Sequence, residues 1–384
     1  MRVWIENPFD NLPVEGFRPQ RYWLMANAFA RAGHDVVLWT ADFNHTTKAR
    51  RAIKDGVRAP FALEFVHEPP YSGNVSLRRM YSHWRYAREW ERIATAYANK
   101  NGAPDVIVAS TPPLSACAAA RRMARRFGAK LVVDVMDAWP ETFERVAPRW
   151  ALSPLRSIAR ANYLGANLVT VVADRYIDLV REYGYAGEAL RFYHGIDLGG
   201  RPDRRHSGNG LAIAYVGNLG RTYDLSTVVR AVAELPDATL DIAGRGDGEE
   251  PLRRLVADLG LESRVRFRGY LGEREMLELL SKCTVGVVPM ASDSCVGVPY
   301  KLCDYAKSGL AIVSSLGGES AALLAKYRAG ASYDPSDVPS LVRALGLLDA
   351  SACGANARRM AEEELDSSAI YDAYVVAVRG RFMV

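Results

Sequence analysis

A lysine and an aspartate three positions apart, Lys301 and Asp304, have the spacing that most clearly indicates chemistry. They lie in the segment PYKLCDYAKSG, which reads as a short helix after a turn of small residues. Side chains at positions i and i+3 share one face of a helix. A lysine beside a helix N-terminus can neutralise a diphosphate, and a carboxylate can accept hydrogen bonds from a ribose diol. Gly297 and Val298 in the preceding turn are candidate contacts for the same ligand. The alternative is an ordinary Lys–Asp pair on the surface.

Two glycine-bearing turns follow apolar segments in the second half of the chain, with the sequences GNLGRTYD and AGRGDGEE. Glycine allows a backbone to approach a ligand closely, and the arginine of the first turn supplies a fixed positive charge, which suits a diphosphate. The second turn superficially resembles a dinucleotide fingerprint, but its third glycine is misplaced, so a nicotinamide enzyme is disfavoured. The candidate contacts are Gly217, Asn218, Gly220, Arg221, Gly244, Arg245 and Gly246.

A loop in the first half of the chain, VEGFRPQR, places Gly16, Arg18 and Arg21 just before the N-terminus of a predicted helix. Backbone N–H groups and the helix dipole favour an anion there. The alternative is that Gly16 only makes a turn and that the arginines are solvated.

The turn DVMDAWPE carries three acids, Asp134, Asp137 and Glu141, at the end of a very apolar segment. Carboxylates at such a place can order sugar hydroxyls, act as general bases or hold a metal ion. Helix capping explains some of them, because an acid followed closely by proline is typical of a helix start. Three acids in eight residues exceed what capping requires.

Short apolar strands that alternate with helices position these turns. This alternation predicts an α/β fold with parallel sheets covered on both faces, in which ligands bind beyond the carboxyl ends of the strands. We expect two doubly wound, Rossmann-like domains that face each other across a cleft, and the polar segment 201–210 is the candidate linker. The predicted strands are 2–6, 34–41, 104–110, 129–137, 167–173, 211–217, 238–244, 264–270, 284–290 and 310–315.

The composition is that of an ordinary globular protein, with 384 residues of which 49% are hydrophobic and 24% charged. It excludes intrinsic disorder and a small disulfide-stapled scaffold. The five cysteines show no CxxC spacing, so we expect neither a structural zinc site nor a disulfide framework, and a reducing cytoplasm is the default. The chain shows neither a signal peptide nor an apolar run long enough to span a membrane.

Positive charge is concentrated in the first half of the chain. Residues 1–195 hold 27 Lys and Arg against 19 Asp and Glu, whereas residues 196–384 hold 22 against 25. The stretch 77–93, LRRMYSHWRYAREWERI, interleaves arginines with aromatic residues and suits an anionic membrane surface. The alternative is an amphipathic helix with its aromatic side chains in the core. We expect no nucleic acid partner, because no nucleic-acid-binding motif accompanies the stretch.

Taken in order, these segments resemble glycosyltransferase family 4, whose members have the GT-B fold. The N-terminal part is similar to bacterial members that assemble cell-surface polysaccharides and glycoconjugates, through its Gly-Phe-Arg-Pro loop, AGHDVVLWTADFNH and DVMDAWPE. The C-terminal part is similar through YVGNLGRTYDL, its G-x-G loop followed by RVRFRGYLG, and PYKLCDYAKSG. The resemblance implies an acceptor-side domain at 1–198, a nucleotide-sugar-binding domain at 199–366, and a terminal helix at 367–384 that crosses back onto the first domain.

The resemblance also implies roles for the candidate residues. Asp304 would contact the donor ribose, while Lys301 and Arg221 would neutralise the diphosphate together with backbone N–H groups of Gly217–Gly220. The segment Gly244–Gly246 would flank the nucleobase. Further contacts follow from the matching positions: Arg268 and Tyr270 would flank the nucleobase, and Gly16 would border the diphosphate. Many relatives carry an acid on the donor sugar eight positions before the helix acid, where this chain has Val296, with Asp293 and Ser294 out of register.

The implied reaction is retaining sugar transfer from a nucleotide-sugar, most commonly a UDP-sugar, to a glycan or lipid-linked acceptor. It needs no cofactor and no metal, because Lys301 and Arg221 can stabilise the leaving diphosphate directly. Asp137 or Glu141 would position the acceptor hydroxyl. Two other functions remain open: a GT-B sugar-nucleotide 2-epimerase, and a non-catalytic nucleotide-sugar-binding protein.

Overall fold

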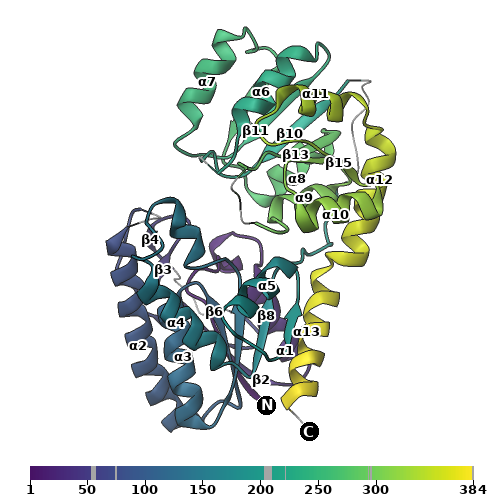
Figure 1. Ribbon diagram of the computed structural model, residues 1–384. Coiled ribbons are helices and arrows are strands. Elements are labelled where there is room, and N and C mark those ends of the chain that lie inside the picture. Colours follow the sequence, from purple (N-terminus) through teal and green to yellow (C-terminus); the bar gives the residue numbers. More distant parts are fainter. Residues whose placement is uncertain are drawn as a thin grey trace. The chain divides into compact units, whose positions relative to one another are not determined.

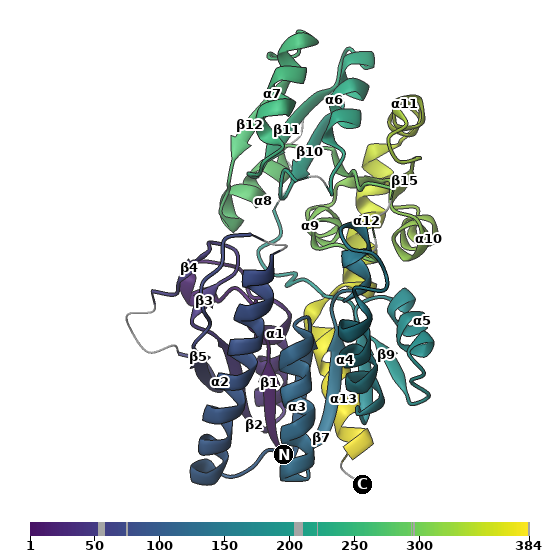
Figure 2. The ribbon, with the colours of Figure 1, turned by 60° about the vertical axis from the view of Figure 1, so that its left-hand side comes forward.

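The computed structural model describes residues 1–52, 58–73, 76–202, 210–220, 222–292, 294 and 296–382. The chain forms two compact units, both visible in Figures 1 and 2. Unit 1 comprises Met1–Tyr193 together with Ser368–Val384, and unit 2 comprises His194–Ser367. Unit 2 therefore begins a few residues before the polar segment 201–210, of which residues 203–209 lie outside the described part.

Unit 1 is built on a seven-stranded parallel sheet with the strand order β5-β2-β1-β6-β7-β8-β9. Both faces of the sheet are covered, which explains why its strands are continuous apolar runs. In β1, for example, Val3 and Ile5 pack in the core beside α1 and α13, whereas Trp4 packs on the other face in the core that includes residues of α2 and α3. The elements are β1 (Arg2–Glu6), α1 (Arg21–Arg31), β2 (Asp35–Ala41), β3 (Phe43–Asn44), β4 (Ala49–Arg50), β5 (Ala62–Val66), α2 (Leu77–Asn101), β6 (Val106–Thr111), α3 (Leu114–Phe127), β7 (Lys130–Val135), α4 (Ser153–Leu164), β8 (Leu168–Val171), α5 (Asp174–Glu182), β9 (Ala189–Arg191) and α13 (Ser367–Phe382).

Unit 2 repeats this plan with a six-stranded parallel sheet in the order β12-β11-β10-β13-β14-β15. The expectation of two doubly wound α/β domains is confirmed. The elements are β10 (Ala212–Val216), α6 (Leu225–Glu234), β11 (Thr239–Ala243), α7 (Glu249–Asp258), β12 (Val265–Gly269), α8 (Glu273–Ser281), β13 (Val285–Val288), α9 (Tyr300–Ser308), β14 (Ala311–Ser314), α10 (Gly318–Tyr327), β15 (Gly330–Ser332), α11 (Val338–Gly346) and α12 (Ala350–Glu364).

The last helix, α13, packs on the sheet of unit 1 although the helix before it, α12, belongs to unit 2. Tyr371 and Tyr374 are buried in the same core as Phe29 of α1. The ring centroid of Tyr374 lies 6.2 Å from that of Phe29 and 4.9 Å from that of Phe192. The terminal helix is thus part of the core of the first unit.

Each sheet has a point at which the strand order reverses. It lies between β1 and β6 in unit 1 and between β10 and β13 in unit 2. In open α/β sheets ligands bind at such points, beyond the carboxyl ends of the strands. The loops that follow β1, β10 and β13 therefore lie where binding is expected, and they contain Gly16, Gly217 and Gly297.

The position of α9 depends on the absence of a side chain at Gly286 in β13. A Cβ atom added there would lie 2.2 Å from the ring of Tyr305, which is fully buried and accepts a hydrogen bond at its hydroxyl from the Val216 amide at 2.9 Å. Replacing Gly286 by alanine should therefore destabilise unit 2 by about 1–3 kcal/mol, the usual cost of overpacking a core. Chemical denaturation of Gly286→Ala tests this, with Gly346→Ala as the matched control because its Cβ would meet open space. Equal stability of the two variants would contradict the packing argument.

Candidate functional site

The two glycine turns of unit 2 interlock at the carboxyl ends of β10 and β11. The Gly217 amide donates to Ala243 O at 2.9 Å, and the Leu219 amide donates to Arg245 O at 3.0 Å. A Cβ atom at Gly244 would lie 1.8 Å from Gly217 O. Gly217 and Gly244 also have φ values of 146° and 149°, which L side chains rarely adopt. Glycine is therefore needed at both positions because one turn packs closely on the other. The sequence alone did not suggest this reason.

Lys301 lies in the first turn of α9, against the first of these glycine turns. Its side chain is buried, with Nζ 3.3 Å from the ring centroid of Tyr223 and 3.5 Å from the hydroxyl of Tyr215. A Cβ atom at Gly217 would be 3.2 Å from Nζ, so the ammonium group lies directly beside the turn. Burial lowers the pKa of Lys301 to about 7, while the nearby Asp304 opposes this shift. A buried lysine with a lowered pKa beside a loop that follows a strand is a candidate anion ligand.

Asp304 follows Lys301 on α9 and is also buried, with 4% of its surface exposed against 6% for Lys301. This burial excludes a solvated surface pair. Gly297 and Val298 lie buried just before the helix, where the Ser320 hydroxyl donates to Gly297 O. Val296, which takes the place of the acid in the family pattern, is half-buried. The expected cation Arg221 lies outside the described residues, as does Asp293.

The remaining candidates of unit 2 are more exposed. Arg268 on β12 donates through Nε to Asp241 on β11 at 2.6 Å, so its guanidinium takes part in an ion pair between neighbouring strands. Tyr270 is 55% exposed, and Arg245 is exposed as well. Asn218 is exposed and its carbonyl accepts a hydrogen bond from the Tyr215 hydroxyl at 2.6 Å, while Gly220 in the same turn is half-buried.

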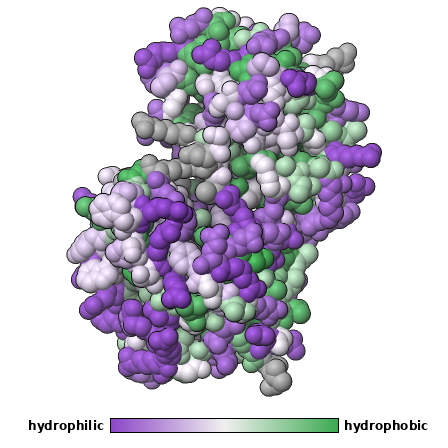
Figure 3. All heavy atoms as spheres, viewed as in Figure 1, coloured by the Kyte–Doolittle hydropathy of each residue, from purple (hydrophilic) through white to green (hydrophobic). Residues whose placement is uncertain are grey.

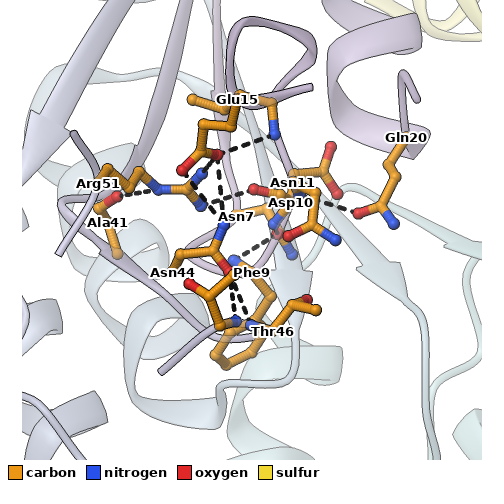
Figure 4. A network of polar contacts seen from close by, with 12 residues as sticks. Asn7, Phe9, Asp10, Asn11, Glu15, Gln20, Ala41, Asn44, Thr46 and Arg51 are labelled. Atoms are coloured by element: carbon orange, nitrogen blue, oxygen red, sulfur yellow. Dashed lines mark hydrogen bonds and ion pairs between the residues drawn. The ribbon is translucent and has the colours of Figure 1, made fainter. Parts of the chain in front are cut away.

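In unit 1, the loop after β1 is held by a network of polar contacts that Figure 4 shows. Arg51 forms an ion pair with Glu15 and donates to Ala41 O at 2.8 Å and to Asp10 O at 2.7 Å. Asn7 Oδ1 accepts from two amides of the same loop at 2.8 Å. The network positions Gly16, which directly follows Glu15 and has a φ of 81°.

Arg21 does not act as the anion ligand that the sequence suggested. It is fully buried and binds both carboxylate oxygens of Asp134, at 2.7 and 2.8 Å. Asp134 also accepts from the hydroxyls of Tyr22 and Thr170. Arg21 completes its contacts with two carbonyl oxygens at 3.0 Å. Both charges therefore serve the core of unit 1, because each is paired with the other.

The two other acids of the DVMDAWPE turn remain close to the carboxyl edge of the sheet. Asp137 accepts hydrogen bonds from the Ala138 amide at 2.9 Å and from the Thr142 hydroxyl at 3.4 Å. Burial raises the pKa of its carboxyl group. Glu141 accepts a hydrogen bond from the Tyr183 hydroxyl and lies 3.3 Å from Arg156. Asp137 thus has its contacts within its own turn, whereas Glu141 is tied to α4 and to the C-terminal end of α5.

Four basic residues at the same edge of unit 1 were not among the site residues that the sequence predicted, although two of them lie in the stretch 77–93. His45 and Lys48 lie between β3 and β4, and Arg79 and His83 lie in the first two turns of α2. The position of His45 and Lys48 could have been recognised from the sequence, because their loop closely follows β2 and ligands bind in loops that follow strands. The second pair is separated by four residues, the spacing of neighbours on one helix face.

Comparison with known proteins defines the family. Residues 20–194 match the model of the glycosyl transferase 4-like domain, and residues 210–349 match that of the glycosyl transferases group 1. The chain belongs to the family 4 glycosyltransferases. It is 24% identical over 386 residues to a protein named glycogen synthase from Mycobacterium tuberculosis, covering 93% of this chain and 90% of that protein.

Solved structures show that this glycosyltransferase has the GT-B fold. A sucrose-phosphate synthase from Thermosynechococcus elongatus aligns with a TM-score of 0.79 at 16% identity, covering 100% of this chain and 99% of that one. The Anabaena protein HepE, crystallised with UDP, aligns with a TM-score of 0.71 at 14% identity, covering 99% of each chain. These likenesses extend over both units.

Proposed function

We propose that this glycosyltransferase moves a sugar, with retention, from a nucleoside diphosphate sugar to a hydroxyl group of a glycan or lipid-linked acceptor. The observation that carries the proposal is the buried pair Lys301 and Asp304 beside the turn of Gly217. UDP is the proposed nucleotide, and the crystal structure of HepE with UDP supports that choice. The assembly of cell-surface polysaccharides or glycoconjugates is the proposed pathway.

Leaving-group stabilisation is the main chemical task in this proposal. Cleavage of the anomeric C–O bond builds negative charge on the departing diphosphate. Lys301, the N-terminus of α9 and Arg221 would stabilise this charge, so that no metal or cofactor would be needed. The ammonium of Lys301 is already desolvated between two tyrosine rings, so less solvent must reorganise around it as charge develops.

Retention fits the chemistry that unit 2 offers next to this pair. The position that carries an acid in many relatives is occupied by Val296, a side chain that cannot act as a nucleophile. Attack of the acceptor on the face from which the diphosphate leaves, assisted by its phosphate oxygens, needs no enzyme nucleophile. In unit 1, Asp137 would orient the acceptor hydroxyl, since burial raises the pKa of its carboxyl and brings it closer to that of a general base.

A membrane-bound acceptor suits the surface of α2. The buried residues Tyr86 and Trp90 show that part of the aromatic stretch belongs to the core, as one interpretation of the sequence expected. The other side of the helix exposes Leu77 (85%), Tyr81 (55%) and Trp84 (47%) among arginines. Figure 3 shows pale and purple residues intermixed along the edge of unit 1 that α2 occupies. We propose that this face contacts an anionic membrane from the cytoplasmic side.

No helix in the described ranges is both long and apolar enough to cross a bilayer.

The proposal is tested by measuring products. Nucleotide-sugars are first screened for those that raise the melting temperature, because a ligand that binds the native state stabilises it. The stabilising donor is then incubated with and without glycan and lipid-linked acceptors, in the presence and absence of a chelator. Transfer with retained anomeric configuration, unaffected by the chelator, is expected. Inversion at C2 of the donor alone would show an epimerase, and binding with neither transfer nor release of sugar would show a binding protein.

A further inference from the structure

A cluster of basic side chains lies at the carboxyl edge of the sheet of unit 1, and the roles proposed above do not use it. Lys48 Nζ lies 3.2 Å from Nδ1 of His45 in the loop between β3 and β4. Arg79 donates through Nε to Nε2 of His83 at 3.3 Å on α2. Two cations and two histidines, from segments that are separate in the sequence, therefore share one place.

Aromatic rings join the two halves of this basic cluster. The Arg79 guanidinium carbon lies 5.5, 5.8 and 5.2 Å from the ring centroids of Phe9, Tyr71 and Trp139. Lys48 Nζ lies 4.9 Å from the centroid of Tyr71. The segments after β1, β5 and β7 thus each contribute one ring, and the rings give the cluster flat apolar faces beside its charges.

Positive charge is crowded in the cluster. Burial and the charge of Arg79 lower the pKa of Lys48 to about 8 and that of His45 to about 3. The acids that face Arg79 are Glu68 and Asp137, and burial raises the pKa of both, to about 7 for Glu68. The negative charge of Glu68 is therefore reduced near neutral pH. An anion with several oxygen acceptors would relieve the repulsion among the basic groups.

The loop that presents Lys48 is fixed by the network in Figure 4. Asn44 accepts hydrogen bonds from the amides of Thr46 and Thr47 at 2.8 and 3.0 Å, and its own amide group donates to Glu15 at 3.2 Å. Lys48 has a φ of 56°, in the left-handed region that favours glycine. A non-glycine residue held in this region by its surroundings is characteristic of binding sites.

We propose that Lys48, Arg79, His45 and His83 bind a phosphate group of a phosphorylated acceptor, an inference that rests on the proposed function. The phosphate oxygens would accept hydrogen bonds from the two cations and, once protonated, from the two histidines. The half-buried ring of Phe9 would pack against the attached sugar. Because Trp139, which lies against Arg79, follows Asp137 by two residues, the sugar hydroxyl would be presented to the Asp137 carboxylate.

Calorimetric titration with inorganic pyrophosphate tests the proposal. The titration uses the full chain with Lys301→Met, so that pyrophosphate binding at the proposed donor site does not contribute. The result is then independent of whether the donor-site proposal is correct. In this background, Lys48→Met should weaken pyrophosphate binding about ten- to hundredfold, the usual effect of losing a charged hydrogen-bond partner. The matched control is Lys100→Met, at the exposed far end of α2, which should change the affinity less than twofold. Melting temperatures verify that both variants fold.

Proton uptake separates a phosphate site from a structural role. Histidines that are neutral in the free protein should gain a proton when an anion binds, so the titration heat should depend on the ionisation heat of the buffer. Farnesyl diphosphate and glucose 1-phosphate distinguish the two sources of phosphate. Tighter binding of farnesyl diphosphate assigns a lipid-linked acceptor. Tighter binding of glucose 1-phosphate assigns a free sugar phosphate. Pyrophosphate binding that is absent, or that is indifferent to Lys48→Met, would overturn the proposal.

Discussion

Replacing Lys301 by alanine should lower the rate of sugar transfer by about 10²- to 10³-fold, the usual loss when one preorganised electrostatic stabiliser is removed. The reason is geometric, because Nζ is buried beside the turn of Gly217 and Asp304, where a diphosphate is proposed to lie. The loss should appear in kcat as well as in kcat/KM, since the charge on the leaving group is greatest in the transition state. The measurement is the steady-state rate of transfer from the donor found by the thermal screen.

The pH dependence provides an independent reading of the same residue. In the free protein the pKa of Lys301 is about 7, so the lysine loses its charge as the pH rises through that value. The kcat/KM should therefore fall above about pH 7, and Lys301→Arg should remove this alkaline limb. Lys282→Ala is the matched control, because Lys282 is an exposed lysine of unit 2 paired with Glu278. Unchanged transfer by Lys301→Ala would contradict the assignment.

Replacing Arg21 by methionine should destabilise unit 1 by about 3–5 kcal/mol, because it leaves the Asp134 carboxylate buried without its counter-charge. Both side chains of this pair are completely inaccessible. The measurement is calorimetric unfolding, with hydrogen exchange in β7 to locate the loss in unit 1. The control is Arg31→Met, whose ion pair with Asp372 is exposed on both sides and should cost less than about 1 kcal/mol.

The sign of a pH effect distinguishes this explanation from a simple packing defect. In the native protein the Arg21 guanidinium helps to hold the pKa of Asp134 below its usual value. Without Arg21, burial should raise the folded-state pKa of Asp134 above its unfolded value, so the variant binds more protons when folded and becomes relatively more stable as the pH falls. A second variant, Arg21→Met with Asp134→Asn, should recover part of the loss. A loss that is the same at pH 5 and pH 8 would contradict the explanation.

The sequence was sufficient to predict most strands of the two parallel sheets and the loops that follow them, but not the edge strands β5, β9 and β15. In runs such as RVWIE and VIVAST, consecutive apolar side chains point to both faces of the strand. This pattern indicates a strand that is covered on both sides. The segment that contains Lys301 and Asp304 was likewise predicted to be a helix, and both residues lie on α9. These predictions succeeded because they depend on interactions between neighbours in the chain.

Other features depend on partners that are distant in the sequence. Arg21 and Asp134 are 113 residues apart, and nothing local distinguishes a buried structural arginine from one that binds an anion. The glycines at 217 and 244 follow different strands, and their mutual contact exists only because β10 and β11 are neighbours in the sheet. The basic cluster around Arg79 also assembles from distant segments, which are the β3–β4 loop and the first two turns of α2.

A crystal structure of the protein with bound UDP would test most directly whether α9 holds the donor. We predict an oxygen of the diphosphate within hydrogen-bond distance of Lys301 Nζ and a ribose hydroxyl within hydrogen-bond distance of the Asp304 carboxylate. UDP bound elsewhere, with neither side chain in contact with it, would contradict the central claim.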